Sequence, residues 1–543
     1  MGLDRHSIAT LTWRHSVPFV FSVLLLCSGG MLLVSGALPA IPEHVNWLRH
    51  LIPLTLMEIS HVIASLAGVF LLFLSRAVRL RLDAAYYACL IVLALGIVAS
   101  LVKGFEWHQA LILLVMFFMF LPTRKYFDRK ASLLTMSFTP QWIALIAVII
   151  IVSTWLGFAA YHHVAYSHEL WWKFSYLDDA PRFLRAALIS AIVVFAYILN
   201  NIFKVQRPKP SEKITAEELR RVRDVAGSSQ DMNGFLALLG DKNLLWSERG
   251  NAFIMYVMTP RYWIAMGDPI GDPDEFAGLL WQFRENAYRH AAYAVFYQVS
   301  DKYLPLYLDR GLVLLKMGEE ARIFLTDFSL EGSKRENQRK TRNRFSKNGF
   351  TFRILEPEEV AGSMQALRQI SDQWLATKNA HEKGFSLGFF NEDYLRHTKI
   401  GVIEKEGRIY AFANYWTLDS RSDIAIDLMR YNPESPVNIM EYLFVESILY
   451  AQKEGYQWFG LGMSPLSGME QHALAPLWHK IGNIIYKHGE DFYNFEGLRI
   501  YKSKFNPAWR PRYLAVPPGP RIPLVLLSIS RIIAGGLTSI FRK

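Results

Sequence analysis

Cysteine is almost absent from this chain of 543 residues, which contains only Cys27 and Cys89, each inside a long apolar stretch. A framework of disulfide bonds is therefore excluded, and thiol chemistry or a cysteine-based metal site is not expected. Disorder and a collagen-like fold are excluded as well, because 52% of the residues are hydrophobic.

Acidic residues are absent from the last 34 residues, 510–543, which carry six basic ones. Residues 204–509 contain 39 basic and 39 acidic residues, whereas residues 1–203 contain 14 and 9. The net charge of +11 therefore belongs to the N-terminal apolar region and the tail. The hydrophilic half as a whole lacks the basic excess that is typical of a nucleic-acid-binding protein.

Phosphate-binding loops are also lacking. The turn GDPIGDP at 267–273 has no lysine of the G-x-x-x-x-G-K-[ST] type, and its glycine spacing is not that of a dinucleotide site. The GLG at 460–462 is too short a pattern to indicate a nucleotide.

Long apolar runs occupy the first 203 residues. Each is close to the length of about 20 residues that a helix needs to cross a bilayer, with the fourth the shortest. Basic residues concentrate in the loops at 76–81 and 124–130, so the positive-inside rule places both termini in the cytoplasm. We therefore expect a transmembrane domain at 1–203, followed by a basic linker at 204–214. The six predicted spans are 18–38, 52–74, 84–102, 107–121, 142–161 and 183–203.

Two polar groups in this region leave alternatives open. Glu58 and His61 lie one helical turn apart, and such a pair either fixes helix packing or forms a headgroup or transport site. His162, His163 and His168 lie beside two tryptophans, so they are either solvated residues of an interfacial aromatic belt or metal ligands.

From residue 215 onward, short apolar strands alternate with helices, which indicates an α/β or α+β fold. The pattern predicts strands at 253–257, 262–265 and 292–298 around a helix at 276–290. Further strands are predicted at 350–355, 401–404, 409–416, 424–428 and 458–461, with helices at 360–378 and 439–454. The order suggests a duplicated fold with units at 215–333 and 334–515. The remaining residues, 516–543, contain an apolar stretch interrupted by basic residues, which predicts a helix that lies on the membrane surface.

The densest charge lies in the segment at 334–347 at the start of the second unit. If this segment is helical, Arg335, Arg339 and Arg342 share one face and form a stripe that could follow phosphates. The phosphates could belong to tRNA, a lipid headgroup or the membrane surface. The alternative is a solvated basic face between two domains.

A second polar group interrupts apolar segments nearer the C-terminus. Because burial of such groups costs several kcal/mol unless they pair, they either form structural ion pairs or line a polar cleft, which we favour. Its members are Asp427 and Arg430, then Asn438 and Glu441 at the start of a helix, and later Glu496, Lys502 and Lys504.

Five ordered motifs closely resemble those of the aminoacyl-phosphatidylglycerol synthases, the multiple peptide resistance factor family. They are GDPIGD at 267–272, KGFSLGFF at 383–390, DLMRY at 427–431 with NIMEYLFVE at 438–446, GLGMSPLSG at 460–468 and FYNFEGLRIYKSKFNPAWRPRY at 492–513. The resemblance implies two tandem acetyltransferase-like (GNAT) folds behind the membrane domain. With about six predicted spans, the membrane region of this chain is shorter than that of the family members in which it acts as a flippase.

The resemblance further implies transfer of a lysyl or alanyl group from aminoacyl-tRNA to the glycerol hydroxyl of phosphatidylglycerol. The expected location is the cytoplasmic face of a bacterial inner membrane, with no cofactor, no metal and possible homo-oligomers. The product would lower the negative surface charge and give resistance to cationic antimicrobial peptides.

The chemistry suggests a role for each polar residue. Transesterification needs an oriented hydroxyl, a proton acceptor and positive charge for the tetrahedral oxyanion. We expect Asp427 to orient the substrate amine or hydroxyl and Arg430 to pair with Asp427 and fix it. Lys502 or Lys504 would stabilise the oxyanion or the lipid phosphate, and Glu496 would hold the α-amino group. Asn438, Glu441 and the arginine stripe complete the predicted substrate contacts.

Three other functions share parts of this pattern. A CoA-dependent acetyltransferase has a similar fold, but no suitably placed [QR]-x-x-G-x-[GA] turn occurs here. Peptidoglycan-branching aminoacyltransferases use charged tRNA but usually have no integral membrane half. The third alternative is a lipid transporter with a regulatory cytosolic domain.

Overall fold

The computed structural model describes residues 5–38, 52–127, 129, 140–160, 184–194, 196, 214–378, 382–470, 472, 478, 495–519 and 521–533. The chain forms two compact units, which we describe separately. The first comprises residues 1–206 with 288–292, and the second comprises 207–287 with 293–543.

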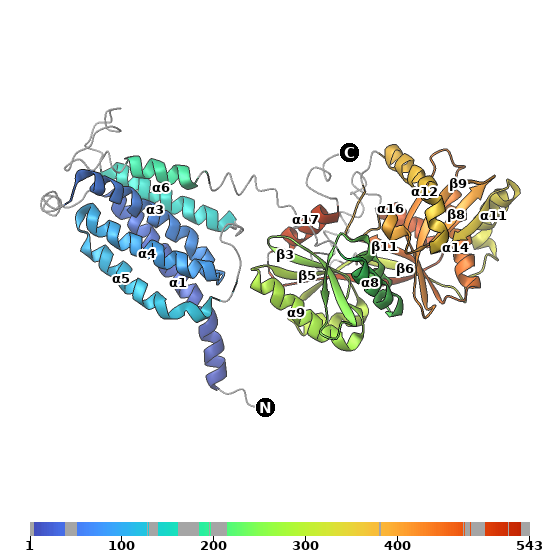
Figure 1. Ribbon diagram of the computed structural model, residues 1–543, viewed down its shortest axis with the longest axis horizontal. Helices are drawn as coiled ribbons and strands as arrows, with labels where there is room; N and C mark the ends of the chain where they lie inside the picture. The colour runs from blue at the N-terminus through green and yellow to red at the C-terminus, as the bar shows by residue number, and fades with distance from the viewer. Residues whose placement is uncertain are drawn as a thin grey trace. The chain divides into compact units, whose positions relative to one another are not determined.

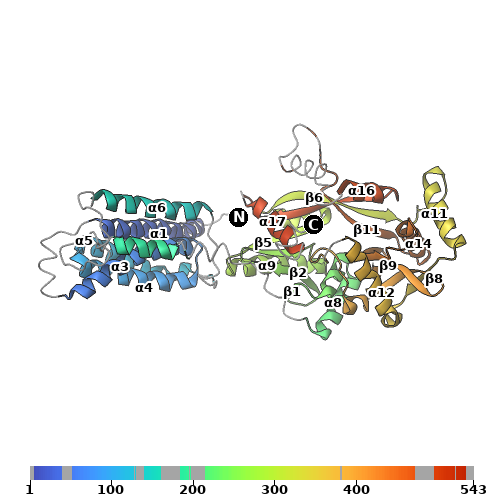
Figure 2. The same ribbon diagram turned by 90° about the horizontal axis from the view of Figure 1, so that it is seen from above.

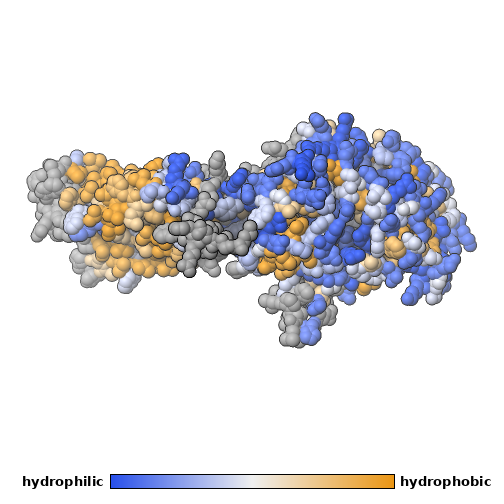
Figure 3. All heavy atoms as spheres, turned by 90° about the horizontal axis from the view of Figure 1, so that it is seen from below, coloured by the Kyte–Doolittle hydropathy of each residue, from blue (hydrophilic) through white to orange (hydrophobic). Residues whose placement is uncertain are grey.

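The first unit is a bundle of apolar helices (Figure 1). Among the described residues, five helices are long and apolar enough to cross a membrane, as predicted for the first five apolar runs. Their surface is largely hydrophobic in Figure 3, as expected for helices in contact with lipid. The helices are α1 (Arg5–Ala37), α3 (Leu54–Arg79), α4 (Asp83–Gly104), α5 (Trp107–Phe120), continued by the 3-10 helix η1 (Leu121–Tyr126), and α6 (Pro140–Ala160).

The sixth predicted span corresponds to a shorter apolar helix, Leu184–Val194. The end of that span, most of the linker and the three outer-loop histidines lie outside the described residues. His61 is buried in α3, whereas the side chain of Glu58 lies outside the described part of the chain. The pairing of these two residues therefore stays a prediction.

Small residues allow α1 and α3 to approach closely. A Cβ atom added at Gly29 would lie 2.7 Å from the carbonyl oxygen of Gly68, and one added at Gly68 would lie 2.9 Å from that of Gly29. Farther along α1, a Cβ atom on Gly36 would meet the hydroxyl of Ser65 at 2.7 Å. Backbone contact at small residues is a common means of helix association in membranes.

We expect Gly29→Ala to destabilise the helix bundle by about 1–3 kcal/mol, because the added methyl group must push α1 and α3 apart. Gly30→Ala is the matched control, since its Cβ atom would meet only a side-chain carbon of Ile149, at 3.7 Å. Thermal unfolding of both variants in detergent checks the prediction. Equal melting temperatures for the two variants would contradict it.

The second unit is built on a 12-stranded sheet (Figure 2), and its surface is mostly hydrophilic (Figure 3). The strand order is β1-β2-β3-β5-β12-β6-β11-β10-β9-β8-β7, and β4 pairs with β2. The strands are β1 (Asn243–Trp246), β2 (Ala252–Met258), β3 (Tyr262–Met266), β4 (Ile270–Gly271), β5 (Tyr293–Ser300), β6 (Val313–Phe324), β7 (Thr351–Leu355), β8 (Lys399–Lys405), β9 (Arg408–Thr417), β10 (Asp423–Tyr431), β11 (Trp458–Pro465) and β12 (Ala508–Val516).

Helices cover the sheet, and all those predicted from the sequence are present. The longer ones are α8 (Ala216–Ser228), α9 (Phe276–Arg289), α11 (Glu336–Lys347), α12 (Pro357–Lys378), α14 (Ile439–Lys453), α16 (Phe495–Ser503) and α17 (Ile522–Ile533). The shorter ones are η4 (Met232–Leu239), η5 (Pro273–Glu275), η6 (Asp301–Tyr303), α10 (Leu304–Leu308), η7 (Ser333–Arg335) and α13 (Glu392–Leu395).

The two halves of the sheet repeat one topology. In each half, antiparallel strands lead into a helix that returns the chain to a parallel strand: β3 and β5 across α9, and β10 and β11 across α14. The predicted fold class is confirmed: an α-helical membrane region is followed by a mixed sheet of two GNAT-like halves.

The halves also exchange a strand. β6 from the first half pairs with β11, whereas β12 from the end of the chain inserts between β5 and β6. Each half thus completes the sheet of the other. The boundary between the two units, predicted between residues 333 and 334, stays a prediction, because the two halves share one continuous sheet.

Candidate functional site

The site lies where two parallel strands of the second half separate. Pairing of β10 with β11 runs from Asp423 opposite Trp458 to Ala425 opposite Gly460, and each strand then has an irregularity with its other neighbour. Beyond the last pair, β10 carries Asp427, and the backbone of β11 accepts hydrogen bonds from a lysine. Asp427 and the backbone atoms that Lys502 contacts therefore both lie past the point where the pairing of β10 with β11 stops.

Asp427 is half-buried, and its carboxyl group has defined partners. One oxygen accepts from the backbone N–H of Gly388 at 2.9 Å, and the other accepts from the hydroxyl of Tyr394 at 2.5 Å. Burial raises the pKa of Asp427 to about 6, although these two bonds and the nearby charges of Lys242 and Arg430 lower it. Near neutral pH the carboxyl group is thus mostly ionised inside the protein.

Arg430 does not pair directly with Asp427, which corrects one expectation. Its guanidinium forms an ion pair with Glu382 at 2.9 Å and lies over the ring of Trp374, with 4.2 Å to the centroid. Glu382 in turn accepts from the backbone N–H of Phe390 at 3.2 Å. Arg430 therefore fixes the segment that leads past Asp427, and it acts on Asp427 through its charge.

The segment 382–390 is held at several points. A Cβ atom at Gly388 would overlap the Asp427 carboxylate at 1.8 Å, so only glycine lets the backbone come this close. Phe385 is buried with a φ of 64°, and its backbone N–H donates to Asp241 at 3.0 Å. A buried non-glycine residue in this conformation carries strain, and strain of this kind clusters at functional sites.

Lys502 is the second unusual group. It lies on α16, and its ammonium donates to the carbonyl oxygens of Gly462 at 3.0 Å and Met463 at 2.9 Å. Burial lowers the pKa of Lys502 to about 7, although the charge of Glu320 raises it. A sizeable fraction of this lysine is thus neutral near pH 7 and can accept a proton.

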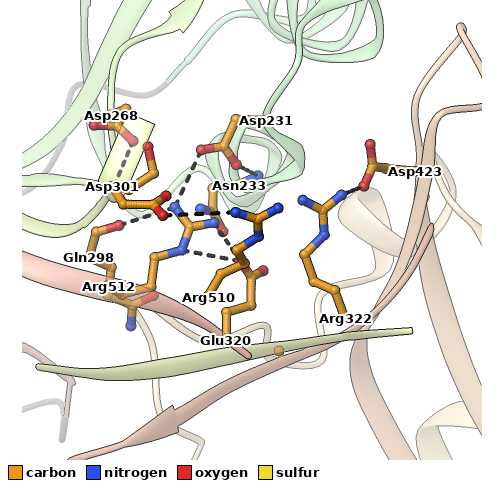
Figure 4. A network of polar contacts seen from close by, with 12 residues as sticks. Asp231, Asn233, Asp268, Gln298, Asp301, Glu320, Arg322, Asp423, Arg510 and Arg512 are labelled. Atoms are coloured by element: carbon orange, nitrogen blue, oxygen red, sulfur yellow. Dashed lines mark hydrogen bonds and ion pairs between the residues drawn. The ribbon is translucent and has the colours of Figure 1, made fainter. Parts of the chain in front are cut away.

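A buried network of charges joins the two halves and was not predicted (Figure 4). Arg512 on β12 makes two contacts with Glu320 on β6, at 2.6 and 3.1 Å, and lies 3.9 Å from Asp231 at the start of η4. Burial disfavours the charge of Arg512, but Glu320, Asp231 and Asp268 outweigh it and raise its pKa. These ion pairs fix the exchanged strands and hold Glu320 near Lys502.

Asp268, in the GDPIGD motif, is also buried in this network. It accepts from the hydroxyl of Tyr307 and the backbone N–H of Ser300, both at 2.8 Å. Burial and the charge of Asp231 raise its pKa to about 6. The motif therefore contributes a buried carboxyl group rather than a phosphate-binding loop.

The remaining predicted site residues lie in different settings. Glu441 is buried on α14, and its charge contributes to the raised pKa of Tyr501. Asn438 begins α14 with a φ of 73°, and Glu496 is exposed on the first turn of α16. The ammonium of Lys504 lies over the ring of Tyr501, with 5.2 Å to the centroid. Their substrate contacts stay predictions.

The predicted arginine stripe is helical over η7 and α11, but its members are engaged within the chain. Arg335 donates to the carbonyl oxygens of Lys504 and Phe505, and Arg339 donates to a loop carbonyl at 2.7 Å. Arg342 pairs with Glu446 at 2.7 Å. A phosphate would therefore compete with these contacts, and phosphate binding by the stripe stays a prediction.

Several groups around Asp427 were missed in the sequence, above all Tyr394, Glu382 and Lys242. Tyr394 and Glu382 flank the KGFSLGFF motif, and this position near a family motif could have indicated that they belong to the site. Lys242 gave no such signal, because it comes from the first half of the unit. Among the described residues, no group of three His, Cys, Asp or Glu side chains could hold a metal ion.

Comparisons with known proteins extend the argument from geometry. The family described as "Phosphatidylglycerol lysyltransferase, C-terminal" matches residues 223–516. The phosphatidylglycerol lysyltransferase of Bacillus subtilis (strain 168) is 29% identical over 524 residues, covering 94% of this chain and 59% of the relative. That of Staphylococcus aureus (strain MRSA252) is 36% identical over 332 residues, covering 60% and 38%. The chain thus spans about half the length of these curated relatives.

Two solved structures are similar to the second unit. One is the C-terminal DUF2156 domain of a candidate lysylphosphatidylglycerol synthetase from Agrobacterium fabrum, with 41% identity and a TM-score of 0.54. It covers 59% of this chain and 98% of that domain. The other is L-PGS from Bacillus licheniformis, with 34% identity and a TM-score of 0.52, covering 60% and 98%.

Proposed function

The chain belongs to the family of the phosphatidylglycerol lysyltransferase C-terminal domain, and from this membership we propose that it is a membrane-bound aminoacyltransferase. It transfers an aminoacyl group, lysyl in the first instance, from aminoacyl-tRNA to a glycerol hydroxyl of phosphatidylglycerol. The reaction takes place at the cytoplasmic face of a bacterial inner membrane. The product carries less negative charge and thereby protects the cell against cationic antimicrobial peptides.

One observation carries the chemistry: a carboxyl group on β10 and a lysine bonded to β11, both past the point where the two strands stop pairing, have pKa values displaced towards neutral pH. The pKa of Asp427 is raised to about 6, and that of Lys502 is lowered to about 7. Titratable groups whose environments displace their pKa values are typical of acid–base sites. A buried lysine serves a transesterification because it can bind a proton and release it again.

The transfer exchanges one ester for another. The glycerol hydroxyl oxygen attacks the ester carbonyl carbon, and its proton passes to neutral Lys502. The tetrahedral intermediate then collapses, the bond to the tRNA ribose oxygen breaks, and Lys502 returns the proton to that oxygen. Ionised Asp427 orients the attacking hydroxyl or the α-ammonium group, with Tyr394 and Gly388 holding its carboxylate in place.

This proposal changes the role that the sequence suggested for Lys502. A permanently charged lysine would stabilise the oxyanion, whereas the buried lysine is better suited to accept the proton. Oxyanion stabilisation then falls to other donors, with Lys504 as the sequence-based candidate. The two roles of Lys502 give opposite dependences on pH.

The test uses the full chain in nanodiscs that contain phosphatidylglycerol. Labelled lysine or alanine is supplied with tRNA and the matching synthetase, and the lipids are then separated. We expect label in the lipid fraction with lysine, and none when phosphatidylcholine replaces phosphatidylglycerol or tRNA is omitted. Label in phosphatidylglycerol with alanine alone would correct the amino acid, and no labelled lipid with either would refute the function.

A further inference from the structure

The C-terminal helix α17 contacts the segment that holds Asp427. The backbone N–H of Gly384 donates to the carbonyl oxygen of Ile533, the last residue of α17, at 3.2 Å. Four residues farther on, Gly388 donates to Asp427. The helix end and the carboxyl group are therefore linked through one short segment.

α17 has one face in the core and one in solvent. Val525 and Ile529 are buried in the larger core cluster, and the helix lies beside β3 (Figure 1). Leu524 and Leu527, one turn apart, are each 42% exposed. Arg521 precedes them and lies over the ring of Tyr293, with 4.6 Å to the centroid.

The charge of this region identifies the partner. Residues 516–543 contain four basic residues, Arg521 and Arg531 among them, and no acidic one, so the exposed leucines lie in a cationic segment. Apolar side chains flanked by cations are the pattern of a helix that lies on an anionic bilayer. An apolar protein partner would not require the absence of acidic residues.

We propose that the Leu524–Leu527 face of α17 docks on an anionic lipid surface and thereby orders the segment 382–390 against Asp427. The buried face and the Ile533–Gly384 bond transmit the docking to the segment, whose strained Phe385 needs external anchors to stay in place. The proposed function enters only as the reason why the segment must be ordered at the membrane. Docking itself is independent of catalysis.

The test is amide hydrogen exchange of the full chain in nanodiscs. One bilayer is phosphatidylcholine alone, and in the other phosphatidylserine replaces part of it, so that anionic charge is supplied without the acceptor lipid. We expect the amides of 382–390 to exchange about five- to tenfold more slowly in the anionic bilayer. The double variant Leu524→Ser/Leu527→Ser should lose this difference.

Leu308→Ser is the matched control, because Leu308 is an equally apolar residue, 55% exposed on α10. Unchanged exchange in β8 and β9 shows that each variant is folded. Equal exchange of 382–390 in the two bilayers, or an unaltered difference in the double variant, would overturn the proposal. Since no transfer is measured, a protein that shows the exchange pattern but makes no aminoacyl lipid would refute the proposed function alone.

Discussion

Replacing Asp427 with asparagine should lower aminoacyl transfer to lipid by about 100-fold or more, the range expected for loss of a positioned charged group at a reaction centre. Asparagine has nearly the same shape and can still accept from the backbone N–H of Gly388, so the fold should persist. What it loses is the negative charge and the second acceptor for Tyr394. The rate of transfer to phosphatidylglycerol in nanodiscs measures the effect.

Two further variants separate position from charge. Gly388→Ala keeps the Asp427 carboxyl group but places a methyl group against it. We therefore expect a loss of activity comparable to that of Asp427→Asn. Tyr415→Phe is the control, because Tyr415 is buried in the same half and its hydroxyl bonds to Ser447 rather than to Asp427. Normal activity of the Asp427→Asn variant would show that Asp427 has no part in the reaction.

Lys502→Met should nearly abolish transfer, because it removes the proton acceptor without adding a charge. In the unaltered protein, activity should rise as the pH passes through about 6 and 7, where first Asp427 and then Lys502 lose their protons. If Lys502 instead served as a cation for the oxyanion, activity would fall as the pH rose through about 7. The sign of the slope therefore distinguishes the two roles.

Lys502→Arg gives an independent answer. Arginine keeps the positive charge but does not release its proton near neutral pH, so it should restore an electrostatic role and not a proton-transfer role. We expect it to be almost as inactive as Lys502→Met. Lys453→Met, at an exposed lysine of α14, is the control for loss of a positive charge from this half. Rescue by arginine would contradict proton transfer.

Much of the architecture could be predicted because the spacing of apolar residues along the chain differs between helices and strands. The first five apolar runs matched membrane-length helices, and the alternating pattern from 253 to 461 located most strands and the three long helices α9, α12 and α14. The long strand β6 and the closing strand β12 were missed because charges interrupt both of them, as at Glu320 and Arg512. Those charges are buried in pairs with each other, which a single strand cannot reveal.

The site could be predicted only in part for the same reason. Asp427 and Lys502 stand out because each is a charge within an apolar or aromatic segment. Their displaced pKa values arise from burial, which partners distant in sequence, such as Lys242 and Glu320, offset only in part. The expected pair of Arg430 with Asp427 was wrong because Arg430 reaches Glu382, which lies 48 residues earlier. Spacing along a strand cannot show which of two nearby carboxylates an arginine will choose.

The most direct test of the account is transfer from purified, pre-charged lysyl-tRNA to phosphatidylglycerol in nanodiscs, with no ATP and no synthetase present. The account predicts that lysine leaves the tRNA and appears on the lipid in equal amounts, and that Asp427→Asn protein gives only the background rate. Hydrolysis of the lysyl-tRNA without lysine on the lipid, or lipid labelling that requires ATP, would contradict direct ester-to-ester transfer at this site.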